Sequence, residues 1–160
     1  MAMQITVNEN LILLDLVGEN KEALLGEMAD NLCKNGFVKD TYKNAILARE
    51  RIFPTGLPTQ PYGIAIPHTD IEHVNAPAIS MARFKKPVDF VIMGEKEATI
   101  PVRVAFMLAM KEKHTQLDML QKLMAVLQDA DALNFLAAEQ NCSAIKTFMQ
   151  EKLGLLFENI

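Results

Sequence analysis

The chain is organised around residues 49–70, which contain a histidine near their end and read Arg49-Glu50-Arg51-Ile52-Phe53-Pro54-Thr55-Gly56-Leu57-Pro58-Thr59-Gln60-Pro61-Tyr62-Gly63-Ile64-Ala65-Ile66-Pro67-His68-Thr69-Asp70. Its middle carries three prolines and a glycine, which cannot continue a helix. The apolar run 62–66 then predicts a β-strand that ends at Pro67 and His68. In α/β proteins the end of a strand is where reactive groups are placed. Our working hypothesis is that His68 is a nucleophile that accepts and passes on a phosphoryl group.

Length and composition limit the class of protein. The 160 residues fit a single domain, 1–160, that is long enough to bury a core. A net charge of −4 argues against a nucleic-acid binder, because phosphate backbones require clustered Lys and Arg. Cys33 and Cys142 lie far apart within helical patterns, which favours buried thiols in a reducing cytosol over a disulfide.

The N-terminal sequence and the apolar runs argue against export and against a membrane span. The N-terminus has no basic segment followed by an apolar one, as a secretory signal would. The longest uninterrupted apolar run, 104–110, is far too short to span a bilayer. These features predict a cytoplasmic protein.

Strands and helices alternate along the chain. We expect strands at 11–16, 62–66, 77–84, 88–93 and 102–110, and helices that begin near Asn20, Asp40, Thr115, Asp131 and Ser143. The turn 85–87 could join two of the strands as a hairpin, and 102–110 is typical of a central strand buried on both faces. The pattern predicts an α/β fold: a single-domain sandwich with a mixed, mostly parallel sheet of about five strands and helices on both faces.

His68 is the first candidate functional residue. A neutral imidazole is a good nucleophile near neutral pH, because its ordinary pKa is about 6.5. One ring nitrogen must be exposed, while the other is held by an acceptor that fixes the tautomer. The alternative is a surface histidine that follows a turn.

Arg49 is the second candidate. The inward stripe of the second helix consists of Tyr42, Ala45, Ile46 and Arg49. This spacing places Arg49 on the buried face, with Glu50 and Arg51 turned away. A guanidinium group suits phosphoryl oxygens well, but a salt bridge with Glu50 or Asp70 would also explain a buried arginine.

His114 is the third candidate, at the start of a strongly amphipathic helix. Thr115 and Asp118 resemble a capping box, which would put His114 at the very N-terminus of that helix. Helix N-termini favour phosphoryl groups through free N–H groups and the helix dipole. The alternative is a solvent-exposed side chain in a lysine-rich loop, and we expect the remaining histidine, His73, at the surface.

No cofactor is expected. The three histidines fit no familiar metal-binding spacing. The chain also lacks a Walker loop, a Gly-x-Gly-x-x-Gly motif and a serine nucleophile elbow. We therefore expect neither ATP nor a metal to bind.

Three motifs together resemble a known family. They are Arg49-Glu50, then Pro54-Thr55-Gly56, then Gly63-Ile64-Ala65-Ile66-Pro67-His68. The chain resembles, along nearly its whole length, the type-2 enzyme IIA domains (fructose–mannitol class) of the bacterial phosphoenolpyruvate-dependent sugar phosphotransferase system. His114 matches a second histidine position of that family.

The resemblance implies a mechanism and partners. His68 would accept a phosphoryl group from the phosphorylated histidine carrier protein and transfer it to a cysteine of the cognate IIB component. IIB in turn phosphorylates sugar that enters through the membrane component IIC, and Arg49 and His114 would line the site. Such a carrier needs an apolar docking patch around its histidine, for which Leu57, Tyr62 and Ile71 are candidates.

Within the family, the chain looks most like the galactitol-specific branch. The residues that carry this likeness are Thr69-Asp70, His73-Val74, Pro87-Val88, Phe90 and Met93-Gly94. Two alternatives stay open. One is a nitrogen-related regulatory IIA protein that acts through phosphorylation-dependent partner binding, and the other is a non-enzymatic binding module in which His68 is incidental.

Overall fold

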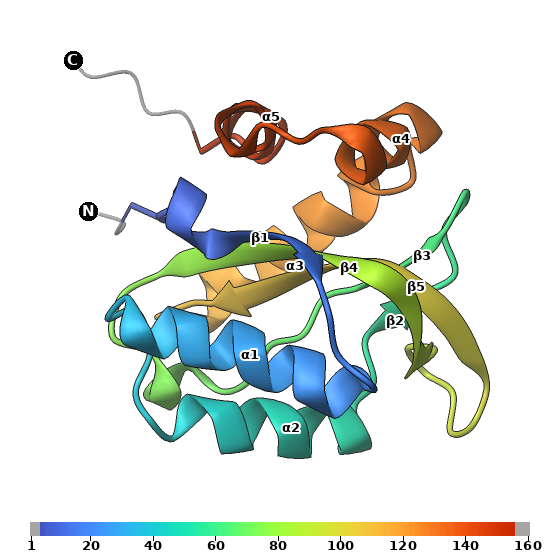
Figure 1. Cartoon of the computed structure of the whole chain (residues 1–160). Helices are drawn as coiled ribbons and strands as arrows, with labels where there is room; N and C mark the ends of the chain where they lie inside the picture. The colour runs from blue at the N-terminus through green and yellow to red at the C-terminus, as the bar shows by residue number, and fades with distance from the viewer. Residues whose placement is uncertain (1–3, 156–160) are drawn as a thin grey trace.

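The computed structural model describes residues 4–155 and contains one sheet between two helical layers (Figure 1). The strands are β1 (Ile12–Leu16), β2 (Gly56–Leu57), β3 (Gly63–Ala65), β4 (Ala78–Val91) and β5 (Thr99–Ala109). The helices are α1 (Lys21–Lys34), α2 (Tyr42–Ile52), α3 (Lys113–Val126), α4 (Ala130–Ala138) and α5 (Cys142–Lys152), with short 3-10 turns η1 (Glu9–Leu11) and η2 (Ile71–His73).

The sheet is mixed, as expected. Its strand order is β1-β4-β5-β3-β2, with β1 at an edge and β5 in the centre. The pairs β1–β4 and β3–β5 are parallel, and the pairs β2–β3 and β4–β5 are antiparallel. The α/β class and the five-stranded sheet are confirmed. The two-residue strand β2, inside the proline-rich loop, was not anticipated.

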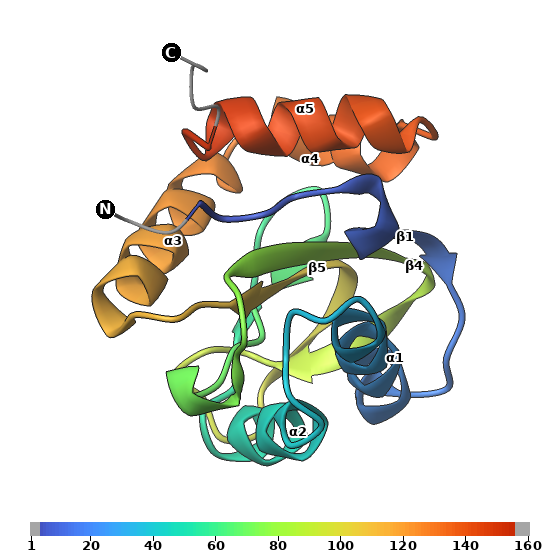
Figure 2. The same ribbon diagram turned by 90° about the vertical axis from the view of Figure 1, so that its left-hand side faces the viewer.

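Alternation along β5 creates two cores, one on each face of the sheet. Val104, Phe106 and Leu108 pack with residues of α3, α4 and α5. Ala105 and Met107 face the other way, toward α1 and α2. Figure 2 shows the two helical layers on opposite sides of the sheet, which confirms helices on both faces.

The segment 85–87 does not turn the chain, so the expected hairpin is wrong there. β4 runs continuously from Ala78 to Val91, and the register jumps from Arg83↔Val104 to Val88↔Val102. The extra residues form a bulge, in which Pro87 does not have to donate a ladder hydrogen bond. The turn between β4 and β5 lies further on and includes Gly94, whose φ of 83° suits glycine.

Helix boundaries follow the capping side chains. Asn20 caps α1 by accepting a bond from the Ala23 N–H (2.9 Å), as expected. α3 and α5 begin within two residues of the expected positions, at Lys113 and Cys142, but Thr115 and Ser143 are not their caps. Glu112 precedes α3, and Asn141 caps α5 by accepting bonds from the N–H groups of Ser143 (2.9 Å) and Ala144 (3.2 Å).

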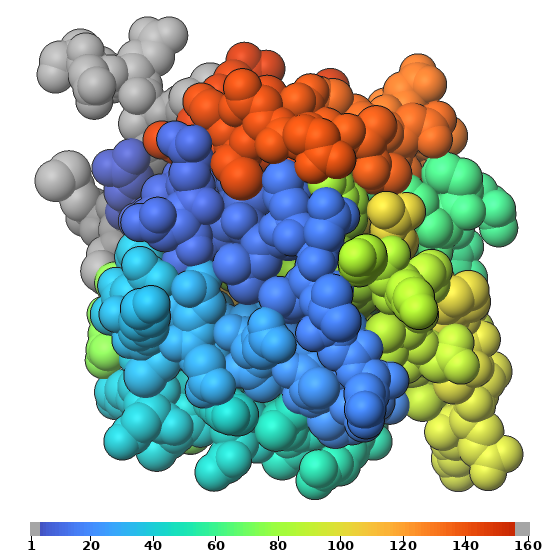
Figure 3. Space-filling model, in the orientation of Figure 1, coloured from blue at the N-terminus to red at the C-terminus, as the bar shows by residue number. Residues whose placement is uncertain are grey.

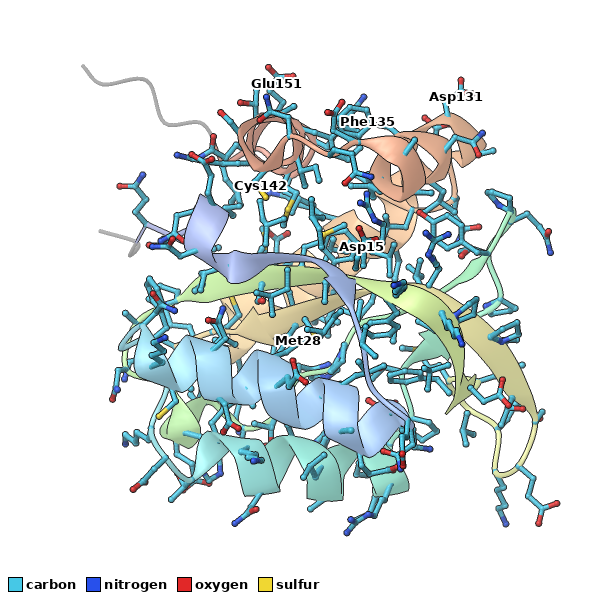
Figure 4. The ribbon with its side chains drawn as sticks, viewed as in Figure 1. Asp15, Met28, Asp131, Phe135, Cys142 and Glu151 are labelled. Atoms are coloured by element: carbon cyan, nitrogen blue, oxygen red, sulfur yellow. The ribbon has the colours of Figure 1, made fainter. Side chains whose placement is uncertain are left out.

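A buried arginine joins the last helices to the sheet. Arg83 is 1% exposed and donates from Nη1 to the carbonyl oxygens of Leu136 (3.2 Å) and Glu139 (2.7 Å), at the end of α4. Its Nη2 donates to Gln140 Oε1 (2.9 Å), and its Nε lies 3.4 Å from Asp15 Oδ1. Figure 4 shows Asp15 where β1 passes under the α4–α5 layer.

On the face seen in Figure 3, η1 and β1 lie between α1 and α5.

No helix within residues 4–155 is long and apolar enough to cross a membrane. Cys33 and Cys142 are free thiols, but each is only partly buried, so the expectation of two buried thiols is wrong.

Candidate functional site

The site forms at the edge of the sheet where β3 and β5 end. These strands are parallel neighbours, so their carboxyl ends meet at one edge. The chain after β3 continues beside β5, and the Leu108 N–H donates to the Pro67 carbonyl oxygen (3.0 Å). His68 is therefore held next to Leu108, at the place that the sequence predicted for a reactive group.

One hydrogen bond sets the chemical state of His68. Its Nδ1 lies 2.9 Å from the carbonyl oxygen of Ile66. A carbonyl oxygen can only accept, so Nδ1 must carry the proton and Nε2 keeps its lone pair. This is the arrangement that an imidazole nucleophile requires.

The environment also keeps His68 neutral. Its side chain is partly buried, and this desolvation lowers the pKa of the imidazole below its ordinary value. The hydrogen bond to Ile66 raises the pKa, while the positive charge of Arg49 lowers it further. The net lowering favours the unprotonated nucleophile around neutral pH.

Arg49 lies near the end of α2, but not on the buried face. Helical spacing carries the stripe from Tyr42 and Ile46 to Glu50, which is 4% exposed, whereas the Arg49 side chain is 36% exposed. The expectation that Glu50 turns away is therefore wrong, while Arg51 is exposed as expected.

The guanidinium group of Arg49 is only loosely engaged. It stacks on the Phe53 ring at 4.4 Å from the ring centroid, and its Nη1 lies 3.8 Å from Asp70 Oδ1. Of the two salt-bridge partners considered for Arg49, the structure places Asp70 near it. The Arg49 side chain is partly exposed and that of Asp70 is exposed, so this ion pair contributes little. The buried Nε of Arg49 has no hydrogen-bond partner among residues 4–155.

His114 lies in the first turn of α3 and is exposed. Two residues further on, Gln116 donates from Nε2 to the carbonyl oxygen of Thr69 (2.9 Å). This bond joins the start of α3 to the residue that follows His68. The elements that carry Arg49, His68 and His114 thus converge on one edge of the sheet, and the hydrogen bond from α3 is made by Gln116.

Two buried residues beside the site, Glu50 and Thr55, were not predicted from the sequence to contribute to it. Glu50 accepts two hydrogen bonds from Thr55, one from its N–H to Oε2 (2.8 Å) and one from its hydroxyl to Oε1 (2.9 Å). Burial raises the pKa of Glu50 to about 7, although the bonds from Thr55 oppose the shift. The repeat of Tyr42, Ile46 and Glu50 at intervals of four residues could have revealed the buried carboxylate.

The apolar surface near the site differs from the expected one. Leu57 is 8% exposed and belongs to the core, and Tyr62 and Ile71 are partly buried. Large apolar side chains are exposed at the end of α2 (Ile52, 69%), directly after it (Phe53, 56%) and on α3 (Leu117, 55%). Phe53 stacks on Arg49, and Leu117 belongs to the same first turns of α3 as His114 and Gln116.

The described residues offer no evident metal site. Within residues 4–155, no group of three or more His, Cys, Asp or Glu side chains is placed to hold a metal ion. His73, expected at the surface, is partly buried, and its Nδ1 lies 2.8 Å from the hydroxyl of Thr41. It takes no part in the cluster around His68.

Comparison with known proteins identifies the family. Residues 6–152 match the family described as "Phosphoenolpyruvate-dependent sugar phosphotransferase system, EIIA 2". The chain belongs to this family, and its general reaction is therefore phosphoryl transfer. The galactitol-specific EIIA component of Escherichia coli K12 is 29% identical over 117 residues, which cover 73% of this chain and 77% of that protein. The fructose-specific EIIABC component of Bacillus subtilis 168 is 35% identical over 131 residues, covering 78% of this chain and 20% of that protein.

Solved structures share the fold. The mannitol enzyme IIA of Escherichia coli, in complex with phosphorylated enzyme IIB, has a TM-score of 0.72 at 23% identity and covers 94% of this chain and 98% of that one. The nitrogen regulatory protein IIA of Neisseria meningitidis has a TM-score of 0.68 at 20% identity, and the match covers 89% of this chain and 94% of that one. At these identities the likeness concerns the fold alone.

The environment of His68 predicts its titration. We expect its NMR titration midpoint to lie below about 6.5, the ordinary histidine value, because burial and Arg49 disfavour the charged ring. Arg49→Ala should raise the midpoint, since it removes a nearby positive charge, whereas the exposed neighbour Arg51→Ala should leave it unchanged. A midpoint at or above the ordinary value in the wild type would contradict this account.

Proposed function

We propose that the protein is a cytoplasmic phosphocarrier in which His68 is the phosphorylated residue. Its Nε2 accepts a phosphoryl group from the phosphorylated histidine carrier protein and passes it to a cysteine of a cognate IIB component. The observation that carries the proposal is the 2.9 Å contact between His68 Nδ1 and the Ile66 carbonyl oxygen. It leaves Nε2 as the free nucleophile at the open edge of the sheet.

The first transfer exchanges one phosphorus–nitrogen bond for another. The lone pair of His68 Nε2 attacks phosphorus in line with the leaving imidazole of the carrier. The new bond to Nε2 forms while the old bond breaks, and the carrier imidazole leaves with the electron pair. The proton on Nδ1 stays in place, held by the Ile66 carbonyl, so the phosphorylated ring needs no further rearrangement.

Arg49 and His114 supply the charge stabilisation that this transfer requires. The guanidinium group of Arg49 is held by stacking on Phe53 and by a long ion pair with Asp70, so its Nη groups can exchange Asp70 for phosphoryl oxygens. His114 offers a ring N–H from the first turn of α3, where the helix dipole also favours negative charge. Positioning and neutralisation of this kind account for most of the catalysis of phosphoryl transfer.

The second transfer runs in the same geometry with a different acceptor. A thiolate of the IIB component attacks phosphorus, and His68 leaves as a neutral imidazole because Nδ1 already carries a proton. A related mannitol enzyme IIA has been solved with phosphorylated enzyme IIB, which supports a IIB partner here. Two exposed apolar side chains could contact both partners: Phe53, which stacks on Arg49, and Leu117, which follows Gln116 at the start of α3.

The proposed pathway is uptake of galactitol. The support is the likeness to the galactitol-specific EIIA component, which is 29% identical. A regulatory role is the second candidate, and the shared fold of a nitrogen regulatory IIA protein favours it. Membrane component IIC is then an indirect partner in the first case and no partner in the second.

A reconstituted transfer reaction tests the phosphocarrier proposal. With phosphoenolpyruvate, enzyme I and the histidine carrier protein, the wild type should gain one acid-labile phosphate, and His68→Ala should gain none. His73→Ala should behave as the wild type, and His114→Ala should still be phosphorylated, though more slowly. Equal labelling of wild type and His68→Ala, or phosphate on His114, would refute the assignment.

Arg49 should matter through its charge. We expect Arg49→Ala to slow phosphoryl transfer about 10²-fold to 10³-fold, the usual effect of removing one group that stabilises transition-state charge. Arg49→Lys should recover part of the rate, because it keeps the charge but not the fork of donors. Stopped-flow or quench measurements check this, with Arg51→Ala as the matched control, and an unchanged rate in Arg49→Ala would reduce Arg49 to a surface ion pair.

The choice of IIB component separates transport from regulation. The phosphorylated protein should transfer its label fastest to a galactitol-specific IIB component, and more slowly to those for fructose or mannitol. Faster transfer to another IIB component would reassign the sugar. A labelled protein that transfers to none of them, yet binds other partners only in one phosphorylation state, would favour the regulatory candidate.

A further inference from the structure

A buried chain of hydrogen bonds leads from α2 to the ring of His68. It starts at Glu50, whose carboxylate is 4% exposed and accepts both the N–H and the hydroxyl of Thr55. Thr55 is itself 2% exposed. A buried carboxylate is costly unless its oxygens are bonded, and here each oxygen has a donor within 2.9 Å.

Thr55 is also bonded to the segment that follows β3 and leads to His68. Its hydroxyl oxygen accepts a bond from the Ile66 N–H (3.2 Å). The ladder between β2 and β3 ends at the pair Gly56↔Ala65, and Thr55 and Ile66 are the next residues outward on each strand. The Thr55 side chain therefore replaces the ladder bond that would come next, at the point where β3 has ended.

Ile66 connects this chain to the ring. Its N–H is held by Thr55, and its carbonyl oxygen lies against Nδ1 of His68. With the N–H fixed on one side and the rigid ring of Pro67 on the other, the carbonyl has little freedom to turn away. The direction of that carbonyl decides which nitrogen of His68 carries the proton.

We infer that Glu50 and Thr55 are positioning residues for the phosphoryl transfer: they hold the Ile66 carbonyl so that His68 keeps its proton on Nδ1 and presents Nε2. This inference rests on the proposed function for its kinetic consequence, but not for the tautomer itself. Neither residue touches the phosphoryl group. Both act through the backbone of Ile66.

A second support holds the other side of the histidine and does not involve Glu50. The Tyr42 hydroxyl donates to the Leu108 carbonyl oxygen (2.8 Å), and the Leu108 N–H donates to the Pro67 carbonyl oxygen (3.0 Å). Loss of the Thr55 bond should therefore loosen the Ile66 carbonyl without releasing the strand end. A defect in the tautomer can thus be separated from general unfolding.

The sharpest variant is Thr55→Val, which keeps the shape and the backbone N–H but removes the hydroxyl. Thr55→Ser restores the hydroxyl, and Glu50→Gln removes the charge and one acceptor oxygen. Ser80→Ala is the matched control, since Ser80 is also fully buried and its hydroxyl donates to the Leu11 carbonyl oxygen (2.9 Å) away from the site. Circular dichroism of each variant verifies that it is folded.

The first measurement needs no partner protein. Imidazole ¹⁵N NMR of the full chain reports the tautomer of His68 from its two nitrogen shifts. The wild type and Thr55→Ser should show the form protonated on Nδ1, whereas Thr55→Val and Glu50→Gln should show a larger share of the form protonated on Nε2. Identical shifts in wild type and Thr55→Val would overturn the inference.

The second measurement is the transfer rate against the concentration of the phosphorylated histidine carrier protein. Thr55→Val should lower the maximal rate about tenfold, the effect of losing one hydrogen bond's contribution to alignment, while the half-saturating concentration changes less than about twofold. Thr55→Ser should restore the rate, and Ser80→Ala should not lower it. A rate loss with an unchanged tautomer, or an equal loss in Ser80→Ala, would make the network merely structural and overturn the inference.

The two measurements keep the two proposals apart. A wild type that takes up no phosphate would refute the phosphocarrier function, while a tautomer shift in Thr55→Val would still support positioning. A wild type that is phosphorylated normally, with Thr55→Val unchanged in both measurements, would refute positioning alone.

Discussion

The bond between His68 Nδ1 and the Ile66 carbonyl is the constraint on which the rest of the site depends. It links two residues that are only two positions apart, so it forms only if the backbone between them is bent and rigid. Pro67 supplies the rigidity, and the parallel pairing of β3 with β5 supplies the support on which the bend rests. An imidazole in solution exchanges between tautomers freely, whereas this one is held in the form that leaves Nε2 available.

The fold brings three segments to the edge of the sheet where His68 lies: the end of α2, the segment after β3 and the start of α3. β3 and β5 run in parallel and end together, and the antiparallel strand β2 returns the end of α2 to the same edge. Arg49 thereby reaches the site from α2, and α3 begins directly after β5. Segments that are far apart in the sequence therefore meet near the histidine, which is typical of sites at the carboxyl ends of parallel strands.

Much of this arrangement could be predicted from the sequence, because it depends on local pattern. The run that ends in Pro67-His68 placed the histidine at a strand end, and the apolar run 102–110 identified the central strand. The buried face of α2 was predicted wrongly. The predicted apolar stripe ran through Ala45 to Arg49, so Glu50 was expected at the surface. Glu50 is buried only because Thr55 lies opposite with two donors, and a contact of that kind depends on the fold of the proline-rich loop. The turn predicted at 85–87 was wrong for a related reason. Two lysines before a proline have the composition of a turn, but a bulge in a long strand accommodates them equally well.

Arg83 has a consequence for how this domain can be divided or joined to others. Its guanidinium group is a permanent charge inside the molecule, and three of its hydrogen-bond partners belong to the stretch from Leu136 to Gln140. A chain that stopped before that stretch would leave this charge with Asp15 as its one remaining acceptor among those described, at 3.4 Å. Helices α4 and α5 are therefore an integral part of the fold. Natural fusions or engineered truncations would have to place their junction beyond them.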